Sequence, residues 1–379
     1  MTVAREAREL IAQLVGIESV NPTLVPGGAG EGEIAAFVAR WLERTGLTVV
    51  VEEVATGRRN VIATAAGSGG GRTLMLNAHM DTVSLGGRDG ALEPRVEGDR
   101  LYGRGSYDMK GSLAAIMLVA AELGRRPLAG DVVLTAVSDE EAGSIGTEAV
   151  VGSSSADAAI VAEPTELRLA VAHRGFVALE IETHGRAAHG SRYDLGVDAI
   201  VRMAPILAAL GELDERLSER EPHPLLGRPS VHASLIEGGQ ELSSYPARCI
   251  LTLERRTLPG ESPELVEEEA REAAGDAADV RRLFAREPLE TPRDEAIVKL
   301  VRETAARVLG RKPDVIGVAF WTDAALLSAA GIPTVVFGPA GEGAHAEVEW
   351  VDLPSVERCV EVFLATAEAF CAPATQGGN

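Results

Sequence analysis

A histidine and an aspartate two residues apart, His79 and Asp81, follow a short, largely apolar run and could take part in metal chemistry. The run, residues 74–78, has the composition of a buried strand, and side chains alternate along a strand with period two, so both residues point the same way. A neutral imidazole beside a carboxylate is typical of a metal ligand with an orienting partner. The same pair would also suit a polar strand end without a function, so the choice between these two interpretations depends on other residues.

Two further apolar runs end in acidic residues. Residues 131–137 lead to Glu140 and Glu141, and residues 158–162 lead to Glu163. Ligands usually bind at the carboxyl ends of strands in open α/β sheets, so these strand ends indicate a site. Adjacent glutamates repel each other unless a cation neutralises them, although a solvated turn or a helix N-terminus would also accommodate such a pair.

Two residues in glycine-rich loops complete the candidate set. Asp108 stands just before an apolar helix, and His345 lies in the loop of residues 341–347. Taken singly, Asp108 could cap the helix and His345 could be an ordinary loop histidine. With the strand-end residues they make two histidines and three or four acids, all at sheet ends or in adjoining loops. That composition suits a hydrolytic site with two metal ions.

The order of strands and helices predicts how these residues are supported. Apolar strands alternate with helices up to residue 175 and again from residue 291, which predicts an α/β fold with a largely parallel sheet covered on both faces. Between them, alternating strands and the helices 198–217 and 263–274 predict a compact α+β unit with a four-stranded antiparallel sheet. We therefore predict a discontinuous domain of residues 1–175 and 291–379, interrupted by an inserted domain of residues 176–290.

The composition excludes several classes of partner. With 57 acidic and 36 basic residues the formal net charge is −21, which argues against nucleic acids and anionic membrane surfaces. No apolar run approaches the roughly 20 residues that a membrane-spanning helix needs. The three cysteines, Cys249, Cys359 and Cys371, lack the close spacing of metal ligands and are expected to be reduced thiols, so we expect a cytoplasmic protein.

The motifs resemble those of one enzyme family, the dinuclear zinc peptidases and deacylases that include acetylornithine deacetylase, succinyl-diaminopimelate desuccinylase, aminoacylase and carboxypeptidase G. Five motifs match in order and approximate spacing: His79-Met80-Asp81, Gly103–Gly111, Asp139-Glu140-Glu141, Glu163-Pro164 and Gly343-Ala344-His345. The similarity spans nearly the whole chain. It implies a zinc-binding catalytic domain and an inserted lid that also forms a homodimer, which here would be residues 176–290.

The resemblance further implies that five residues hold two divalent metal ions, with zinc expected and cobalt as the alternative. Asp108 would bridge the two ions. His79 and Glu163 would complete one metal site, and Glu141 and His345 would complete the other. Each site would then combine an imidazole with carboxylate oxygens, which are ligand types that zinc accepts.

Four other residues would act around the metal ions. Asp81 would hydrogen-bond His79 and fix its tautomer, and Glu140 would act as general base toward a metal-bridging water. In the inserted domain, His189 would cross to the partner chain and stabilise the oxyanion, and Arg256 would bind a substrate carboxylate through its planar guanidinium. A loop histidine and a surface salt bridge are the respective alternatives for His189 and Arg256.

The resemblance leads to a predicted reaction on a small amino-acid-derived substrate. We expect hydrolysis of the amide bond of an N-acyl amino acid, acetylornithine-like or succinyl-diaminopimelate-like first, because a glutamate at the position of Glu163 tends to accompany deacylases. A carboxypeptidase or dipeptidase of the same family is the alternative. A non-catalytic metal-binding assembly protein is disfavoured, because metal binding alone does not require Glu140 and Asp81. Ser243 stands where relatives often carry asparagine, which leaves the acyl group and the amino acid open.

Overall fold

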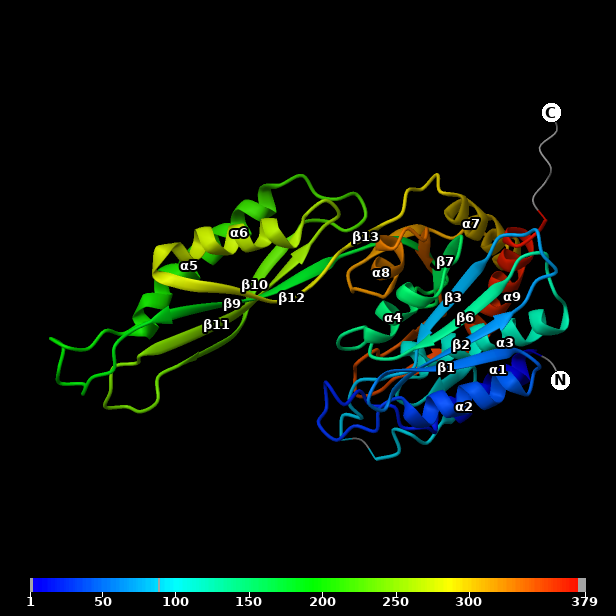
Figure 1. The fold of residues 1–379 in the computed structure, drawn as a ribbon, viewed down its shortest axis with the longest axis horizontal. Helices are drawn as coiled ribbons and strands as arrows, with labels where there is room; N and C mark the ends of the chain where they lie inside the picture. Colours follow the sequence, from blue (N-terminus) through cyan, green and yellow to red (C-terminus); the bar gives the residue numbers. More distant parts are fainter. Residues whose placement is uncertain (1–2, 88, 374–379) are drawn as a thin grey trace. The chain divides into compact units, whose positions relative to one another are not determined.

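The central β-sheet of the chain has nine strands, and four strands in its middle all run parallel (Figure 1). The computed structural model describes residues 3–87 and 89–373. The strands are β1 (Thr48–Ala55), β2 (Arg58–Ala65), β3 (Leu74–His79), β6 (Val132–Val137), β7 (Ala158–Val161), β8 (Leu169–His173), β13 (Leu289–Glu290), β14 (Val315–Val318) and β15 (Thr334–Val336). They lie in the order β1-β2-β6-β3-β7-β15-β8-β13, with β14 paired to β8. The predicted α/β fold with a mostly parallel central sheet is confirmed, and antiparallel pairs lie at its edges.

The helices around this sheet form two groups (Figure 1). The first group is α1 (Val3–Val15), α2 (Gly32–Glu43), α3 (Gly111–Arg125), α7 (Ala296–Leu309) and α9 (Leu353–Phe370), and the second is α4 (Ile145–Ser153) and α8 (Ala324–Ala329). α3 contacts α1, α2 and α9 as well as β2, β3 and β6. Its residues 111–121 are all buried, as a helix that is apolar on every side predicts.

A second, small sheet joins two segments that are far apart in the chain. Its strands are β4 (Arg95–Glu97), β5 (Arg100–Tyr102), β16 (Gly341–Glu342) and β17 (Trp350–Asp352), in the order β16-β17-β5-β4. The antiparallel pairing of β17 with β5 places Trp350 opposite Tyr102. The sequence did not predict these strands, because two or three residues are too few to show a hydrophobic period. The pairing matters because the loops beside β5 and β17 carry Asp108 and His345.

The inserted segment forms a four-stranded antiparallel sheet with two helices, as predicted. The strands are β9 (Gly175–His184), β10 (Ser230–Gly238), β11 (Arg248–Thr257) and β12 (Ala278–Arg286), in the order β10-β11-β9-β12, and the helices are α5 (Ala199–Glu219) and α6 (Pro263–Ala274). Leu179, Leu251 and Leu253 point from the sheet into a core that α5 completes with Met203 and Leu210. β12 was missing from the sequence prediction because four of its nine residues are charged and all nine are half-exposed or exposed.

The chain divides into two compact units. Unit 1 comprises Met1–Val171, Thr291–Ile316 and Thr322–Asn379, and unit 2 comprises Ala172–Glu290 and Gly317–Trp321. The predicted inserted domain, residues 176–290, lies within the first segment of unit 2. The short segment Gly317–Trp321 also belongs to unit 2, whereas the prediction placed it in the other domain. Among the described residues, no helix has both the length and the hydrophobicity needed to cross a bilayer.

Candidate metal centre

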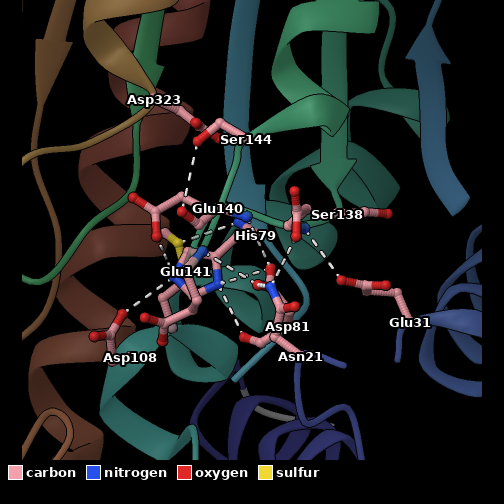
Figure 2. A network of polar contacts seen from close by, with 12 residues as sticks. Asn21, Glu31, His79, Asp81, Asp108, Ser138, Glu140, Glu141, Ser144 and Asp323 are labelled. Carbon is pink, nitrogen blue, oxygen red and sulfur yellow. Dashed lines mark hydrogen bonds and ion pairs between the residues drawn. The ribbon is translucent and has the colours of Figure 1, made fainter. Parts of the chain in front are cut away.

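Three neighbouring parallel strands deliver the predicted acids and His79 to one edge of the central sheet. His79 is the last residue of β3, which lies between β6 and β7 and runs parallel to both. The register pairs His79 with Val137, so the segments that follow β6 and β7 emerge beside it and carry Glu140 and Glu163. Figure 2 shows His79 in the middle of the cluster, with Asp108 and Glu141 on one side of it.

The two histidines are linked by a single carboxylate. Asp108 Oδ1 lies 3.1 Å from His79 Nε2, and Asp108 Oδ2 lies 3.4 Å from His345 Nε2. His79 Nε2 is also 3.6 Å from Glu163 Oε1, and His345 Nε2 is 2.9 Å from Glu141 Oε2. Each histidine therefore faces one oxygen of Asp108 and one further glutamate, which is the arrangement that a carboxylate bridging two cations requires.

Burial makes two carboxylates of this cluster, those of Glu140 and Glu163, poor at holding negative charge. Burial raises the pKa of Glu140 well above its usual value, and the neighbouring Glu163 raises it further. The pKa of Glu163 is raised in the same way, again mainly by burial. Hydrogen bonds to Asp108 and Glu141 raise the pKa of His345 to about 10. The cluster therefore needs positive charge, which protons or bound cations can supply.

The donor set fits divalent metal ions. Ligand atoms of His79, Asp108 and Glu141 lie within 4.8 Å of one another, and so do those of His79, Glu140 and Glu163. Among the described residues, the buried Glu141 Oε1 has no hydrogen-bond partner, as expected of an oxygen that accepts a metal ion. Imidazole nitrogen and carboxylate oxygen are both ligands of zinc. The position of Glu140 is also compatible with a ligand, so its role must be tested separately.

The predicted hydrogen bond between His79 and the Asp81 carboxylate is not the contact that the structure shows. His79 Nδ1 lies 3.0 Å from the backbone carbonyl oxygen of Asp81 and 3.7 Å from Oδ1. Because a carbonyl oxygen only accepts, Nδ1 carries a hydrogen, which leaves Nε2 as the ring nitrogen that a cation would bind. The Asp81 carboxylate instead accepts from the backbone N–H groups of Glu140 and Glu141, both at 3.2 Å. The sequence argument considered only side chains and overlooked the carbonyl.

A buried polar network behind Asp81 contains Asn21, Glu31 and Arg58, which the sequence analysis did not identify. Asn21 Nδ2 donates to Asp81 at 2.7 Å and to Asp139 at 3.0 Å. The Arg58 guanidinium donates to Asp139 at 2.8 Å and forms two hydrogen bonds with Glu31, at 2.5 and 2.6 Å. Figure 2 shows Asn21 and Glu31 on the side of His79 opposite Asp108. No local pattern could have identified Arg58, because Arg59 beside it is also an arginine and is half-exposed.

The other two predicted site residues belong to unit 2. His189 is exposed in the loop after β9, with Nδ1 2.8 Å from Ser191 Oγ. Arg256 lies in β11, where Nε donates to Glu254 at 2.7 Å and the guanidinium stands 5.2 Å from the centre of the Phe176 ring. The residues of the cluster all belong to unit 1.

Comparison with known proteins agrees with this chemistry. Residues 75–369 match the model of a family described as Peptidase family M20/M25/M40. The chain is 32% identical to acetylornithine deacetylase from Myxococcus xanthus, over 96% of this chain and 97% of that protein. It is 29% identical to acetylornithine deacetylase from Proteus mirabilis, over 96% of each.

Solved structures show the same fold at lower identity. An M20 family metallo-carboxypeptidase from Sulfolobus solfataricus has a TM-score of 0.80 at 20% identity, covering 96% of this chain and 99% of that one. A dinuclear metal binding peptidase of the M20 family from Bacillus subtilis has a TM-score of 0.73 at 18% identity, covering 97% of this chain and 98% of that one.

The buried network yields a prediction for stability. Replacing Arg58 by Gln removes the positive charge that Glu31 and Asp139 share, so the free energy of unfolding should fall by about 3–5 kcal/mol. Arg59→Gln is the matched control. Among the described residues, Arg59 pairs with Glu53 at 3.5 Å, and the two side chains are 43% and 50% exposed, so the loss of this pair should cost no more than about 1 kcal/mol. Urea titration of both variants measures the difference, and equal losses would contradict this account of the network.

Proposed function

The chain belongs to peptidase family M20/M25/M40, and on that premise we propose that it hydrolyses N-acyl amino acids with the help of two divalent metal ions. It is a hydrolase that acts on amide bonds. The observation that carries the proposal is the position of Asp108, with one carboxylate oxygen toward His79 and the other toward His345. The acetylornithine deacetylases among its relatives support an acyl amino acid as the substrate.

We assign the metal ligands as the sequence analysis did, with zinc as the proposed metal. Asp108 would contribute to both metal sites, His79 and Glu163 would complete one, and Glu141 and His345 would complete the other. When bound, such ions polarise an amide carbonyl and lower the pKa of a water molecule. The chain contributes the geometry: the Asp81 carbonyl holds the tautomer of His79, and the Asp81 carboxylate holds the turn that carries Glu140 and Glu141.

Glu140 is the general base of the proposed reaction. Its Oε2 lies 3.9 Å from His79 Nε2, which is farther than the nearest carboxylate oxygens of Asp108 and Glu163. Glu140 is therefore not needed as a ligand and is free to face the substrate. Burial raises its pKa, and a carboxylate with a raised pKa can both accept a proton from water and return it to the leaving amine.

Substitution of the two adjacent glutamates separates base from ligand. Glu140→Gln keeps the side-chain shape but cannot take a proton, so kcat should fall by about 10²–10⁴-fold while two metal ions stay bound. Glu141→Gln is the paired comparison and should lose metal as well as activity. Steady-state kinetics and metal analysis on the same samples decide the matter. If Glu140→Gln lost one metal ion, Glu140 would be a metal ligand. If its kcat were near normal, Glu140 would not be the general base.

A substrate panel tests the reaction itself. N-acetylornithine, N-succinyl-diaminopimelate and dipeptides should be compared on the zinc-loaded protein. We expect kcat/KM for an N-acyl amino acid to exceed that for any dipeptide by at least about tenfold, which corresponds to one well-made pocket contact. A preference for dipeptides would establish the peptidase alternative suggested by the metallo-carboxypeptidase fold. Metal binding without turnover of any amide would favour the assembly protein.

We further propose that unit 2 forms a homodimer. β10 is an edge strand of its sheet, and Leu235 and Ile236 on it are 65% and 52% exposed. On α5, which packs against β10, Val201 is 66% exposed. A long edge strand with exposed apolar side chains is prone to pair with another strand, and a second copy of the chain offers a self-complementary partner.

The location we propose is the cytoplasm. Cys249, Cys359 and Cys371 are all buried and free. Reduced thiols of this kind are typical of proteins in a reducing compartment, which supports the location expected from the sequence.

The dimer also gives His189 a proposed role, as a donor to the oxyanion in the partner's site, while Arg256 binds the substrate carboxylate. Two inactive variants, His189→Ala and Glu140→Gln, should therefore complement each other when co-expressed. In a mixed dimer, the chain with intact Glu140 receives the intact His189 of its partner, so about a quarter of all sites should be active. No recovery of activity above the separate variants would contradict a role for His189 across the dimer.

A further inference from the structure

Glu349 is a buried carboxylate that no motif and no step of the reaction has used. It lies immediately before β17, and its side chain is 2% exposed. Oε1 accepts from the backbone N–H groups of Tyr107 and Asp108, at 2.9 and 3.0 Å. Oε2 accepts from the backbone N–H of Gly105 at 2.9 Å and from Arg104 Nη1 at 2.8 Å. Both oxygens are thus fully engaged, and three of the four donors are backbone N–H groups of the loop that carries Asp108.

Arg104 extends this contact to the loop that carries His345. Its Nη1 pairs with Glu349, and its Nη2 donates to the carbonyl oxygen of Ala346 at 2.8 Å. The backbone joins the same segments, because Gly103 N–H donates to the Glu349 carbonyl oxygen at 3.1 Å. Glu349 itself follows His345 by only four residues. One carboxylate and one guanidinium therefore connect the backbone next to Asp108 with the backbone next to His345.

The Asp108 loop depends on such a partner because its backbone is not in a regular helix. Asp108 has φ −118° and ψ 92°, and Gly105 has φ 78° in the left-handed region. A Cβ atom on Gly105 would lie 2.7 Å from Thr82 Cγ2, so only glycine fits there. Backbone N–H groups outside helices and sheets need another acceptor when they are buried. The Glu349 carboxylate is that acceptor.

We propose that Glu349, together with Arg104, is a positioning residue that sets the separation of Asp108 and His345 and thereby the affinity of the metal site they share with Glu141. The inference rests on the proposed metal ligands. Asp108 Oδ2 and His345 Nε2 are 3.4 Å apart, and neither loop belongs to the central sheet that fixes the other ligands. Residues that orient metal ligands typically change metal affinity by 10–100-fold when they are replaced.

Glu349→Gln tests the proposal with little change of shape. Glutamine keeps one oxygen but turns the other into an NH₂ group, which faces N–H donors instead of accepting from them. In titrations of the metal-free chain with Zn²⁺ and a competing chelator, the ion assigned to Glu141 and His345 should bind about 10–100-fold more weakly, and the other ion, which shares only Asp108 with it, should be weakened less. Activity should fall at limiting Zn²⁺ and recover in excess Zn²⁺. Glu342→Gln, an exposed change in the same small sheet, should match the wild-type chain in every measurement.

A second variant keeps the test valid if Glu349→Gln does not fold, as judged by circular dichroism. Arg104→Lys retains the charge but cannot reach both Glu349 and the Ala346 carbonyl, so it should weaken the same ion to a smaller degree. Binding of two Zn²⁺ ions with wild-type affinities by a folded Glu349→Gln, or failing that by Arg104→Lys, overturns the positioning role. Failure of the wild-type chain to bind two ions would instead overturn the proposed metal centre.

Discussion

Repulsion among closely spaced carboxylates is the constraint on which the rest of the structure depends. Asp108, Glu140, Glu141 and Glu163 gather around two histidines at the carboxyl ends of β3, β6 and β7. At about 4 Å, two unit charges repel by about 4 kcal/mol where the effective dielectric constant is near 20. Burial adds a desolvation cost, which is why the pKa values of Glu140 and Glu163 rise. The fold tolerates this arrangement because rigid strands hold the acids in place and protons or divalent cations can neutralise them.

The sequence predicts the strand-end residues well because their signal is local. Each of three apolar runs stops at a polar residue, and the parallel order β6-β3-β7 then brings these ends together without further information. Asp108 and His345 were candidates by residue type, but their roles as metal ligands depended on family resemblance, since a loop has no period from which its position in space can be inferred. Their contacts in the structure support the proposed roles.

The residues that support the cluster from behind could not be predicted from the sequence, for a different physical reason. Arg58, Glu31 and Glu349 are charged, and charged residues are usually exposed, so nothing in their neighbourhood suggests burial. Their partners lie far away along the chain: Glu31 is 27 residues from Arg58, and Glu349 is 241 residues from Asp108. The small sheet brings Glu349 close to Asp108, but its strands of two or three residues are too short to show a hydrophobic period. Pairing of buried charges is a property of the tertiary structure and cannot be seen in a window of sequence.

The carboxylates of Asp81 and Glu349 share a feature with a consequence for how such an enzyme can evolve. Both hold the cluster by accepting from main-chain N–H groups, at residues 140 and 141 in one case and at residues 105, 107 and 108 in the other. A main-chain donor survives almost any mutation of the residue that bears it, proline excepted. Side chains that meet the substrate can therefore drift while the scaffold beneath them keeps its shape. A carboxylate that holds the main chain in this way can be kept in related enzymes that cleave different amides.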